Sequence, residues 1–172
     1  MATHLKPPAP LPAAGQTPIV FLAGSIDMGA AEDWQALVAE ALHAEDVILL
    51  NPRRDDWDAS WSQRIDNPPF RAQVEWELDG LERADVIFMF LAADSKAPIS
   101  LLELGLHAQR GTIILCCAPQ FWRRGNVEVL CHRHDIPLLD RLDDGIAMLR
   151  QRLDAIQRRC EDTTSEPNDE PS

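Results

Sequence analysis

Residues 18–23 of the chain, Pro-Ile-Val-Phe-Leu-Ala, form an unbroken apolar run that ends directly before Gly24. Runs of the same kind follow at residues 46–50 (DVILL), 85–91 (DVIFMFL) and 112–117 (TIILCC). Short segments that are apolar at nearly every position are typical of strands buried on both faces of a sheet. These runs therefore predict the central strands of the fold.

The segments between these runs carry apolar residues at intervals of three and four, which is the spacing of amphipathic helices. This spacing predicts helices at residues 30–44, 68–83, 101–109, 125–133 and 142–159. An apolar stretch at residues 136–139 adds a fifth strand. The alternation of strands and helices predicts an α/β fold, a flavodoxin-like (Rossmann-like) three-layer sandwich with a five-stranded parallel sheet in the order 2-1-3-4-5.

The chain of 172 residues is long enough for one domain of ordinary size. We expect the α/β domain to occupy residues 18–160. Residues 1–17 contain four prolines and predict a flexible arm, because proline disfavours regular hydrogen-bonded structure. Residues 161–172 (EDTTSEPNDEPS) contain no apolar residue and predict a disordered acidic tail.

The composition is acidic, with 16 Lys and Arg against 28 Asp and Glu and a net charge of −12. We expect neither a nucleic-acid polymer nor a membrane as a partner, because both require a basic face. No apolar run reaches the roughly 18 residues of a membrane span, and no signal peptide is recognisable, so we expect a cytoplasmic protein. The cysteines and histidines show no metal-ligand spacing, and we expect no metal and no cofactor.

A sheet of this order binds ligands outside the carboxyl ends of its strands, where the strand order reverses. The loops expected there are residues 24–29, 51–54 and 92–103. In the first loop, Gly24 lets the backbone approach a ligand, and the following helix offers free N–H groups to an anion. An ordinary turn between strand and helix explains the same residues equally well. Gly24, Ser25 and Asp27 are the candidate substrate-binding residues of this loop.

Glu103 is a charged residue among leucines, one turn into an expected helix. Two interpretations remain open. In the first, Ser100 and Glu103 form a capping box, in which the glutamate side chain returns to the serine backbone N–H. In the second, Glu103 is a carboxylate nucleophile, partly removed from water and held in its ionised form by the helix N-terminus.

The helix expected at residues 68–83 carries Glu75, Asp79 and Glu82 on one face. Neighbouring arginines can neutralise these charges, and the face is then a solvated, salt-bridged surface. The alternative is that Asp79, near the end of the helix, points at the ligand as an acid–base group.

The loop after the second strand contains Asn51, Arg53, Arg54, Trp57 and Trp61. The arginines either form a fork for a phosphate group or pair with three aspartates just downstream. The tryptophans either stack on a planar ligand or cover an edge of the core.

Three segments together resemble one enzyme superfamily. They are residues 20–26 (VFLAGSI), 77–86 (ELDGLERADV) and 100–105 (SLLELG). In this order they resemble the nucleoside 2-deoxyribosyltransferase superfamily, whose relatives include the 2'-deoxynucleoside 5'-monophosphate N-hydrolases. The resemblance covers about residues 18–140.

The resemblance implies a flavodoxin-like subunit that forms a homodimer or a larger homo-oligomer and acts on the N-glycosidic bond of a nucleoside or nucleotide. It implies that Glu103 is the nucleophile and that Asp79 positions or protonates the substrate. It also implies that Asn126 reaches the sugar from a neighbouring subunit. The remaining substrate contacts are expected from Gly24, Ser25, Asp27, Asn51, Arg53, Asp94 and Ser100.

The sequence departs from the pattern of this superfamily at two positions. The transferases carry an acidic residue six positions before the nucleophile, where this chain has Ala97; Asp94, three residues earlier, is the nearest candidate. The hydrolases carry a basic residue in the phosphate loop, where this chain has Asp27. We expect a 2-deoxyribosyltransferase or an N-hydrolase. The alternative is a non-catalytic module on the same fold that binds or senses a nucleoside or nucleotide.

Overall fold

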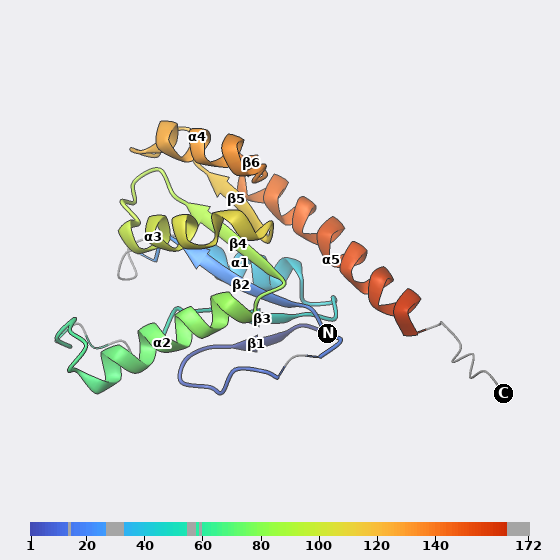
Figure 1. The fold of residues 1–172 in the computed structure, drawn as a ribbon, viewed down its shortest axis with the longest axis horizontal. Coiled ribbons are helices and arrows are strands. Elements are labelled where there is room, and N and C mark those ends of the chain that lie inside the picture. Colours follow the sequence, from blue (N-terminus) through green and yellow to red (C-terminus); the bar gives the residue numbers. More distant parts are fainter. Residues whose placement is uncertain (14, 27–32, 55–57, 59, 165–172) are drawn as a thin grey trace.

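A parallel sheet of six strands lies at the centre of the described residues in the structure, which is a computed structural model (Figure 1). The described residues are 1–13, 15–26, 33–54, 58 and 60–164. The strands are β1 (Thr3–Leu5), β2 (Ile19–Gly24), β3 (Ile48–Leu50), β4 (Val86–Leu91), β5 (Ile113–Cys117) and β6 (Leu138–Leu139). They lie in the order β1-β3-β2-β4-β5-β6, so the strand order reverses between β2 and β4.

The strands expected from the sequence are all present and follow the expected 2-1-3-4-5 order. The number of strands is corrected from five to six, because β1 forms an additional edge strand beside β3. Thr3 aligns with Ile48, and Leu5 aligns with Leu50. The sequence conceals this strand because it is only three residues long, too short to show a readable pattern, and prolines begin two residues after its end.

Helices cover both faces of the sheet and make the expected three-layer sandwich (Figure 1). Within the described residues they are α1 (Trp34–Ala41), α2 (Pro68–Arg83), α3 (Pro98–His107), α4 (Arg124–His134) and α5 (Leu142–Thr164), with a 3₁₀ turn, η2 (Ala108–Arg110), after α3. The helices α1 and α5 pack on one face, and α2, α3 and α4 pack on the other. The bounds of α2 agree with the prediction from its spacing.

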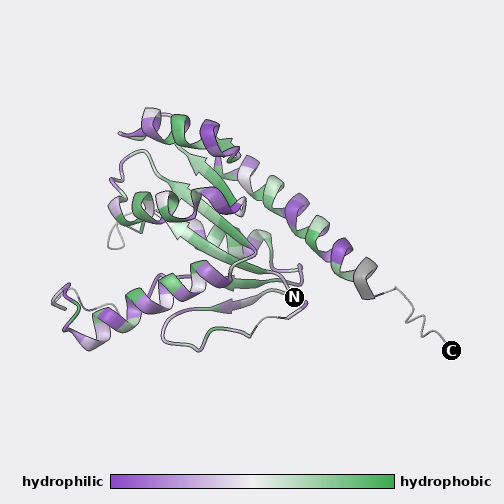
Figure 2. Cartoon of the chain, viewed as in Figure 1, coloured by the Kyte–Doolittle hydropathy of each residue, from purple (hydrophilic) through white to green (hydrophobic). Residues whose placement is uncertain are grey.

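Alternate residues of the central strands enter two separate apolar clusters. Phe21 and Met89 pack with α2, α3 and α4, whereas Leu22 and Phe88 pack beneath α1 and α5. Figure 2 shows the central strands in the colour of apolar residues, whereas the helices carry many polar residues. The central strands are thereby shielded from water on both faces, which explains why their sequences are apolar at nearly every position.

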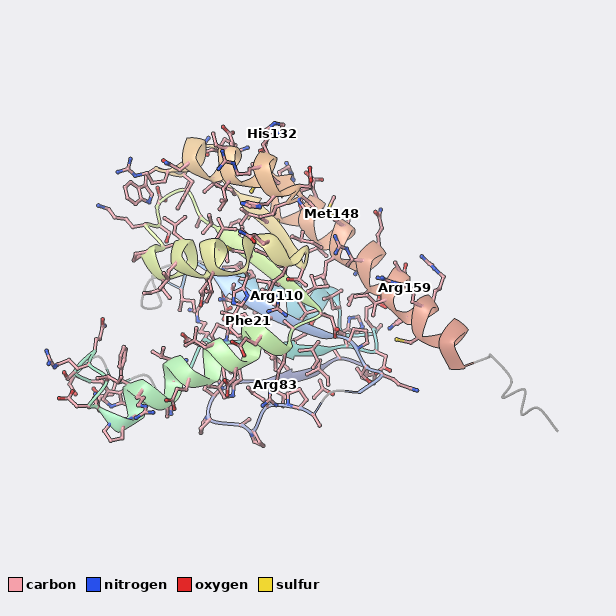
Figure 3. All side chains as sticks on the ribbon, in the orientation of Figure 1. Phe21, Arg83, Arg110, His132, Met148 and Arg159 are labelled. Carbon is pink, nitrogen blue, oxygen red and sulfur yellow. The ribbon has the colours of Figure 1, made fainter. Side chains whose placement is uncertain are left out.

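Residues 1–13 lie against the domain. Beyond β1, the indole N–H of Trp76 donates to the carbonyl oxygen of Ala9 at 2.8 Å. Arg83, labelled in Figure 3, donates from Nη1 to the carbonyl oxygen of Pro12 at 3.0 Å. Two leucines of this segment also pack against the cluster beneath α2. Apolar contacts and hydrogen bonds therefore attach the described part of the segment that we expected to be a flexible arm.

The last helix is longer than its spacing predicts. α5 runs to Thr164 and so continues into the segment expected to be a disordered tail, while residues 165–172 lie outside the described residues. In the part of the chain that the structure describes, none of the helices combines the length and apolar character that crossing a membrane requires.

Candidate active site

Glu103 lies on the buried face of α3, with 9% of its surface exposed. The helix begins at Pro98, three residues before its expected start, because proline is favoured in the first turn of a helix. Ser100 therefore lies inside the helix, and the N-cap residue is Ala97, which makes no side-chain cap hydrogen bond. The capping-box interpretation of Ser100 and Glu103 is wrong for this reason.

The surroundings of the Glu103 carboxyl group disfavour its negative charge. Burial is the main cause, and repulsion from the Glu77 carboxylate adds to it, so that the pKa of Glu103 rises from 4.5 to about 8. No residue in the described ranges gives this carboxyl group a hydrogen bond or an ion pair. In the free protein at neutral pH, Glu103 therefore holds a proton.

Glu77 on α2 is the acidic residue that lies close enough to Glu103 to change its pKa. Burial raises the pKa of Glu77, and a hydrogen bond from Gln73 opposes this rise. The bond runs from Gln73 Nε2 to Glu77 Oε1 and is 2.7 Å long. Because it stabilises the ionised form, Glu77 is the member of the carboxyl pair that loses its proton more readily.

Two close contacts fix α2 relative to the sheet and to α3. A Cβ atom added at Gly80 would lie 2.9 Å from the ring of Phe21, so glycine permits this close approach. Arg110, labelled in Figure 3, donates from Nη1 to Leu81 O at 3.1 Å and from Nη2 to Glu82 O at 2.9 Å. The guanidinium thereby caps the C-terminal end of α2. These contacts hold α2, which carries Glu77, in a fixed position relative to α3, which carries Glu103.

Asp79, the expected acid–base residue, lies on the exposed side of α2. It is two residues from Glu77, and two residues turn a helix by about 200°. The sequence does contain a signal for Glu77: Gln73, Glu77 and Gly80 share one helical face, and Gly80 marks the closest approach to the sheet. Leu78 is 40% exposed, so the buried face of α2 does not run through it.

Gly24 and Ser25 join the ends of β2 and β4 where the strand order reverses. Gly24 has a φ of 139°, and a Cβ atom there would lie 2.2 Å from Phe90 O, so only glycine fits. The Ser25 N–H donates to Phe90 O at 2.9 Å, and Ser25 Oγ accepts from the Ala92 N–H at 3.1 Å. These contacts fix the start of the loop between β4 and α3. Asp27 lies outside the described residues.

Asn51 and Arg53 shape the loop after β3. Asn51 is buried, and its Oδ1 accepts from the Arg53 backbone N–H at 2.9 Å, which is the pattern of an Asx turn. Arg53 Nη1 lies 3.5 Å from Oδ1 of Asp33, the N-cap residue of α1. Arg54 lies over the ring of Trp61, 5.2 Å from its centroid. Positions 55–57, which include two of the aspartates and the first tryptophan of this loop, lie outside the described residues.

The loop between β4 and α3 contributes one buried hydroxyl group. Asp94, an expected substrate contact, is exposed, whereas Ser95 beside it is only 3% exposed. Ser95 Oγ has no hydrogen-bond partner among the residues that the structure describes. Sequence reasoning missed Ser95, and no periodicity or motif distinguishes it. The expected contact Ser100 is buried on α3.

Asn126 is exposed near the start of α4 and lines a hollow of about 350 Å³ between α3 and α4. Trp122 and Leu130 also line this hollow, whereas Glu103 and Glu77 do not. The structure therefore does not bring Asn126 together with the carboxyl pair of its own chain.

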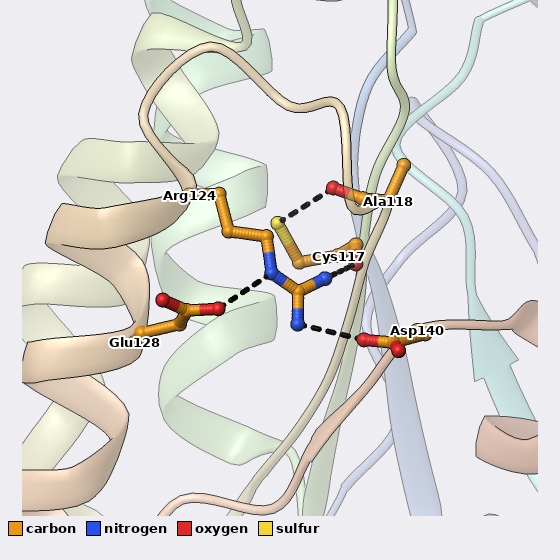
Figure 4. A network of polar contacts seen from close by, with 5 residues as sticks. All are labelled: Cys117, Ala118, Arg124, Glu128 and Asp140. Carbon is orange, nitrogen blue, oxygen red and sulfur yellow. Dashed lines mark hydrogen bonds and ion pairs between the residues drawn. The ribbon is translucent and has the colours of Figure 1, made fainter.

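Arg124 ties the first turn of α4 to the end of β5 (Figure 4). Its Nε donates to Glu128 Oε1 at 2.8 Å and its Nη2 donates to Asp140 Oδ1 at 2.6 Å, while Nη1 donates to Cys117 O. Asn126, two residues further along, is thus presented from a firmly held turn.

The sulfur and metal chemistry of the described residues is limited. Burial raises the pKa of Cys116 to about 12 and the pKa values of Cys117 and Cys131 to about 11, so these thiols are poor nucleophiles. The described ranges contain no group of three or more His, Cys, Asp or Glu side chains that could hold a metal ion.

Comparison with known proteins identifies a family. Residues 17–121 match the model of a family described as nucleoside 2-deoxyribosyltransferase like, and this match covers more than half of the chain. It extends from before β2 to beyond β5 and includes Glu77 and Glu103. No curated protein matches the chain. Because the match spans the central strands and both helices that carry the carboxyl pair, the chain belongs to the nucleoside 2-deoxyribosyltransferase-like family.

Proposed function

We propose that the protein breaks the N-glycosidic bond of a nucleoside or nucleotide and transfers the sugar to water or to a second base, with Glu103 as the nucleophile. Membership of the family supports a nucleoside ligand. One observation carries the proposal: Glu103 is a buried carboxyl group without a hydrogen bond among the described residues, beside the partly buried carboxyl group of Glu77. Buried carboxyl groups with a structural role are normally hydrogen-bonded or paired with a cation, so this arrangement favours a chemical role.

Two neighbouring carboxyl groups that together hold one proton suit this reaction. When the C1'–N bond breaks, the sugar gains oxocarbenium character and the leaving base must receive a proton. The proton of the pair passes to the base, and the ionised Glu103 bonds to C1' to form a glycosyl ester. Water or a second base then attacks C1', the C1'–O bond to Glu103 breaks, and the proton released by the attacking group returns to the pair.

Glu77 is the group we assign to carry the proton between the pair and the base. The hydrogen bond from Gln73 favours ionised Glu77 in the free protein, so the proton rests on Glu103. Before Glu103 can attack C1', this proton must leave it, and Glu77 is the neighbouring acceptor. Glu77 takes the place of Asp79 in the mechanism, because the Asp79 side chain is exposed.

We assign binding of the rest of the substrate to the loops at the carboxyl ends of the strands. Gly24, Ser25, Asn51 and Arg53 lie on loops that begin at the ends of β2 and β3, and we assign to them the sugar and its 5' substituent. The positive charge of Arg53 is balanced by its ion pair with Asp33, so a 5'-phosphate has to compete with the Asp33 carboxylate for the Arg53 guanidinium. This competition favours a nucleoside over its monophosphate.

The outer face of α3 supports assembly with a second copy of the chain. Ile99, Leu102 and Leu106 are 58%, 69% and 62% exposed and lie on one stripe of the helix. Soluble monomers rarely expose apolar side chains in a continuous patch. Trp122 and Asn126 line the adjacent hollow between α3 and α4. We assign this face to a homodimer contact, in which Asn126 reaches the carboxyl pair of the neighbouring subunit.

Release of free base from a panel of nucleosides and 5'-monophosphates tests the proposed activity. We expect release by the parent protein and its loss in Glu103→Gln. Glu75→Gln is the matched control, because Glu75 is exposed on α2 and pairs with Arg71 at 2.6 Å. Release without an added base identifies a hydrolase, and formation of a new nucleoside only with an added base identifies a transferase. Nucleoside binding without any base release would overturn the enzyme assignment and favour a non-catalytic binding module.

A further inference from the structure

Gln73 is a buried amide side chain on α2, one helical turn before Glu77, and only 4% of its surface is exposed. Its Nε2 donates to Glu77 Oε1 at 2.7 Å and to Pro52 O at 3.0 Å. An amide nitrogen has two hydrogens, so these bonds use its full donor capacity. Gln73 thus connects the loop after β3 to one member of the carboxyl pair.

These two acceptors determine the orientation of the Gln73 amide. If the amide were rotated by half a turn, its Oε1 would face the oxygen atoms of Pro52 and Glu77, and acceptors repel one another. Oε1 therefore points away from both of them. It is buried and has no hydrogen-bond partner in the described part of the chain.

A buried acceptor without a partner is unusual in a folded protein and lowers its stability. It is expected where a ligand supplies the missing donor. Gln73 lies in a suitable place, because Pro52 follows the carboxyl end of β3 and the first half of α2 projects past the strand ends (Figure 1). A second buried group without a partner, Ser95 Oγ, comes from the loop at the carboxyl end of β4. Two unsatisfied polar groups therefore come from one edge of the sheet.

We propose that Gln73 selects substrates whose base carries an exocyclic amino group, which donates a hydrogen bond to Oε1, while Nε2 positions Glu77. This inference rests on the proposed function. We assign the base as the partner of Oε1 because Glu77 gives its proton to the leaving base, and Gln73 lies four residues, about 6 Å, further out along α2. Adenine and cytosine present such an amino group, whereas hypoxanthine and uracil place a carbonyl oxygen there, which would face Oε1 as a second acceptor.

The test compares nucleosides that differ at this one group, namely 2'-deoxycytidine with 2'-deoxyuridine and 2'-deoxyadenosine with 2'-deoxyinosine. Dissociation constants are measured in a Glu103→Gln protein, which binds substrate without breaking it. We expect the amino-bearing member to bind about tenfold tighter or more. Gln73→Met keeps the length of the side chain but cannot accept or donate, so it should abolish the preference. Gln109→Met, a change at an exposed glutamine of η2, is the matched control and should keep it.

A separate measurement, the pH profile of kcat/KM, tests whether Gln73 positions Glu77. In the protein with Glu103 intact, Gln73→Met removes the donor that favours ionised Glu77, so the acid limb of the pH profile of kcat/KM should move to higher pH. A merely structural role of Gln73 would lower activity without moving this limb.

The possible outcomes separate this inference from the proposed function. Equal affinities for both members of each pair in the Glu103→Gln protein would overturn the inference, as would equal weakening of both members by Gln73→Met. If Gln73→Met does not fold, Gln73→Leu takes its place; it also lacks an acceptor and should lose the amino preference, and a variant that keeps the preference would overturn the inference. If no nucleoside binds at all, the proposed function fails and this inference fails with it.

Discussion

The indole nitrogen of Trp76 lies 2.8 Å from the carbonyl oxygen of Ala9, and this hydrogen bond joins the N-terminal segment to the helical turn that carries Glu77. Trp76 also packs against Phe21, with 6.2 Å between the ring centroids. A segment that lies far from Glu77 in the sequence therefore helps to hold the helix of the proposed acid group.

Trp76→Phe should lower the free energy of unfolding by about 1 kcal/mol, because it removes the hydrogen bond and keeps an aromatic ring. Trp122→Phe is the matched control, since Trp122 is half exposed and donates to Lys96 O at 3.1 Å. Denaturant unfolding of both variants measures the difference. An equal effect at the two positions would show that the contact with Ala9 contributes nothing specific.

Glu103→Gln should stabilise the protein at pH 8 and change its stability little at pH 4. Folded Glu103 keeps its proton up to about pH 8, whereas the unfolded chain loses it near pH 4.5, so the free energy of unfolding falls as the pH rises between these values. This difference is worth at most about 5 kcal/mol. Glutamine does not ionise in this range, so Glu103→Gln should recover part of the free energy of unfolding that the parent protein loses. Unfolding curves at several pH values test this, and a variant less stable than the parent at pH 8 would contradict it.

Glu77→Gln should slow base release by about 10²–10⁴-fold, which is the usual contribution of a positioned general acid. Asp79→Asn removes the same charge two residues away, on the exposed side of α2, and should leave the rate near that of the parent. The rates of the two variants are compared under identical conditions. A severe loss in Asp79→Asn with a mild loss in Glu77→Gln would return the acid–base role to Asp79.

Leu102→Glu should dissociate the proposed homodimer, because it places a charge in the middle of the apolar stripe of α3. Sedimentation of the parent and the variant measures this. Arg133→Glu, on α4, is the control for an added surface charge, since Arg133 is exposed. A parent protein that sediments as a monomer while fully active would exclude the dimer as a requirement.

Mixing subunits tests whether Asn126 serves the neighbouring site. Glu103→Gln and Asn126→Ala should each be nearly inactive alone. After the two are dissociated and reassembled together, half of the dimers are mixed and carry one intact site, so activity should return to about a quarter of the parent value. No recovery in a mixture shown to contain mixed dimers would place Asn126 outside the site.

Gly24→Ala should lower the free energy of unfolding by about 3 kcal/mol or more, because the new methyl group would lie 2.2 Å from Phe90 O. Gly105→Ala should have the opposite effect. Its Cβ atom meets nothing within 4 Å, and alanine is favoured over glycine within a helix by about 0.5–1 kcal/mol. Thermal or denaturant unfolding gives both values. Similar destabilisation at the two positions would contradict the close contact at Gly24.

The central strands could be predicted from the sequence because strands buried on both faces must be apolar at nearly every position. Glu103 could be found because a single charge among leucines stands out at the start of a helix. Two features depend on packing and escaped prediction. β1 is recognisable only through its partner β3. The buried face of α2 is set by the approach of Gly80 to Phe21, and this approach brings Glu77 rather than Asp79 toward Glu103.

The pairing of β1 with β3 also bears on the order in which the chain can fold. Thr3 pairs with Ile48, which is 45 residues further along the chain. During synthesis the first strand therefore waits for its partner, and a parallel pairing across so long a loop is slow to form. β3 can meanwhile pair with β2, because Ile19 is only 29 residues before its partner Ile48. The N-terminal strand accordingly joins a sheet whose inner strands are already assembled, and the outer edge of β3 stays open to other chains until it does.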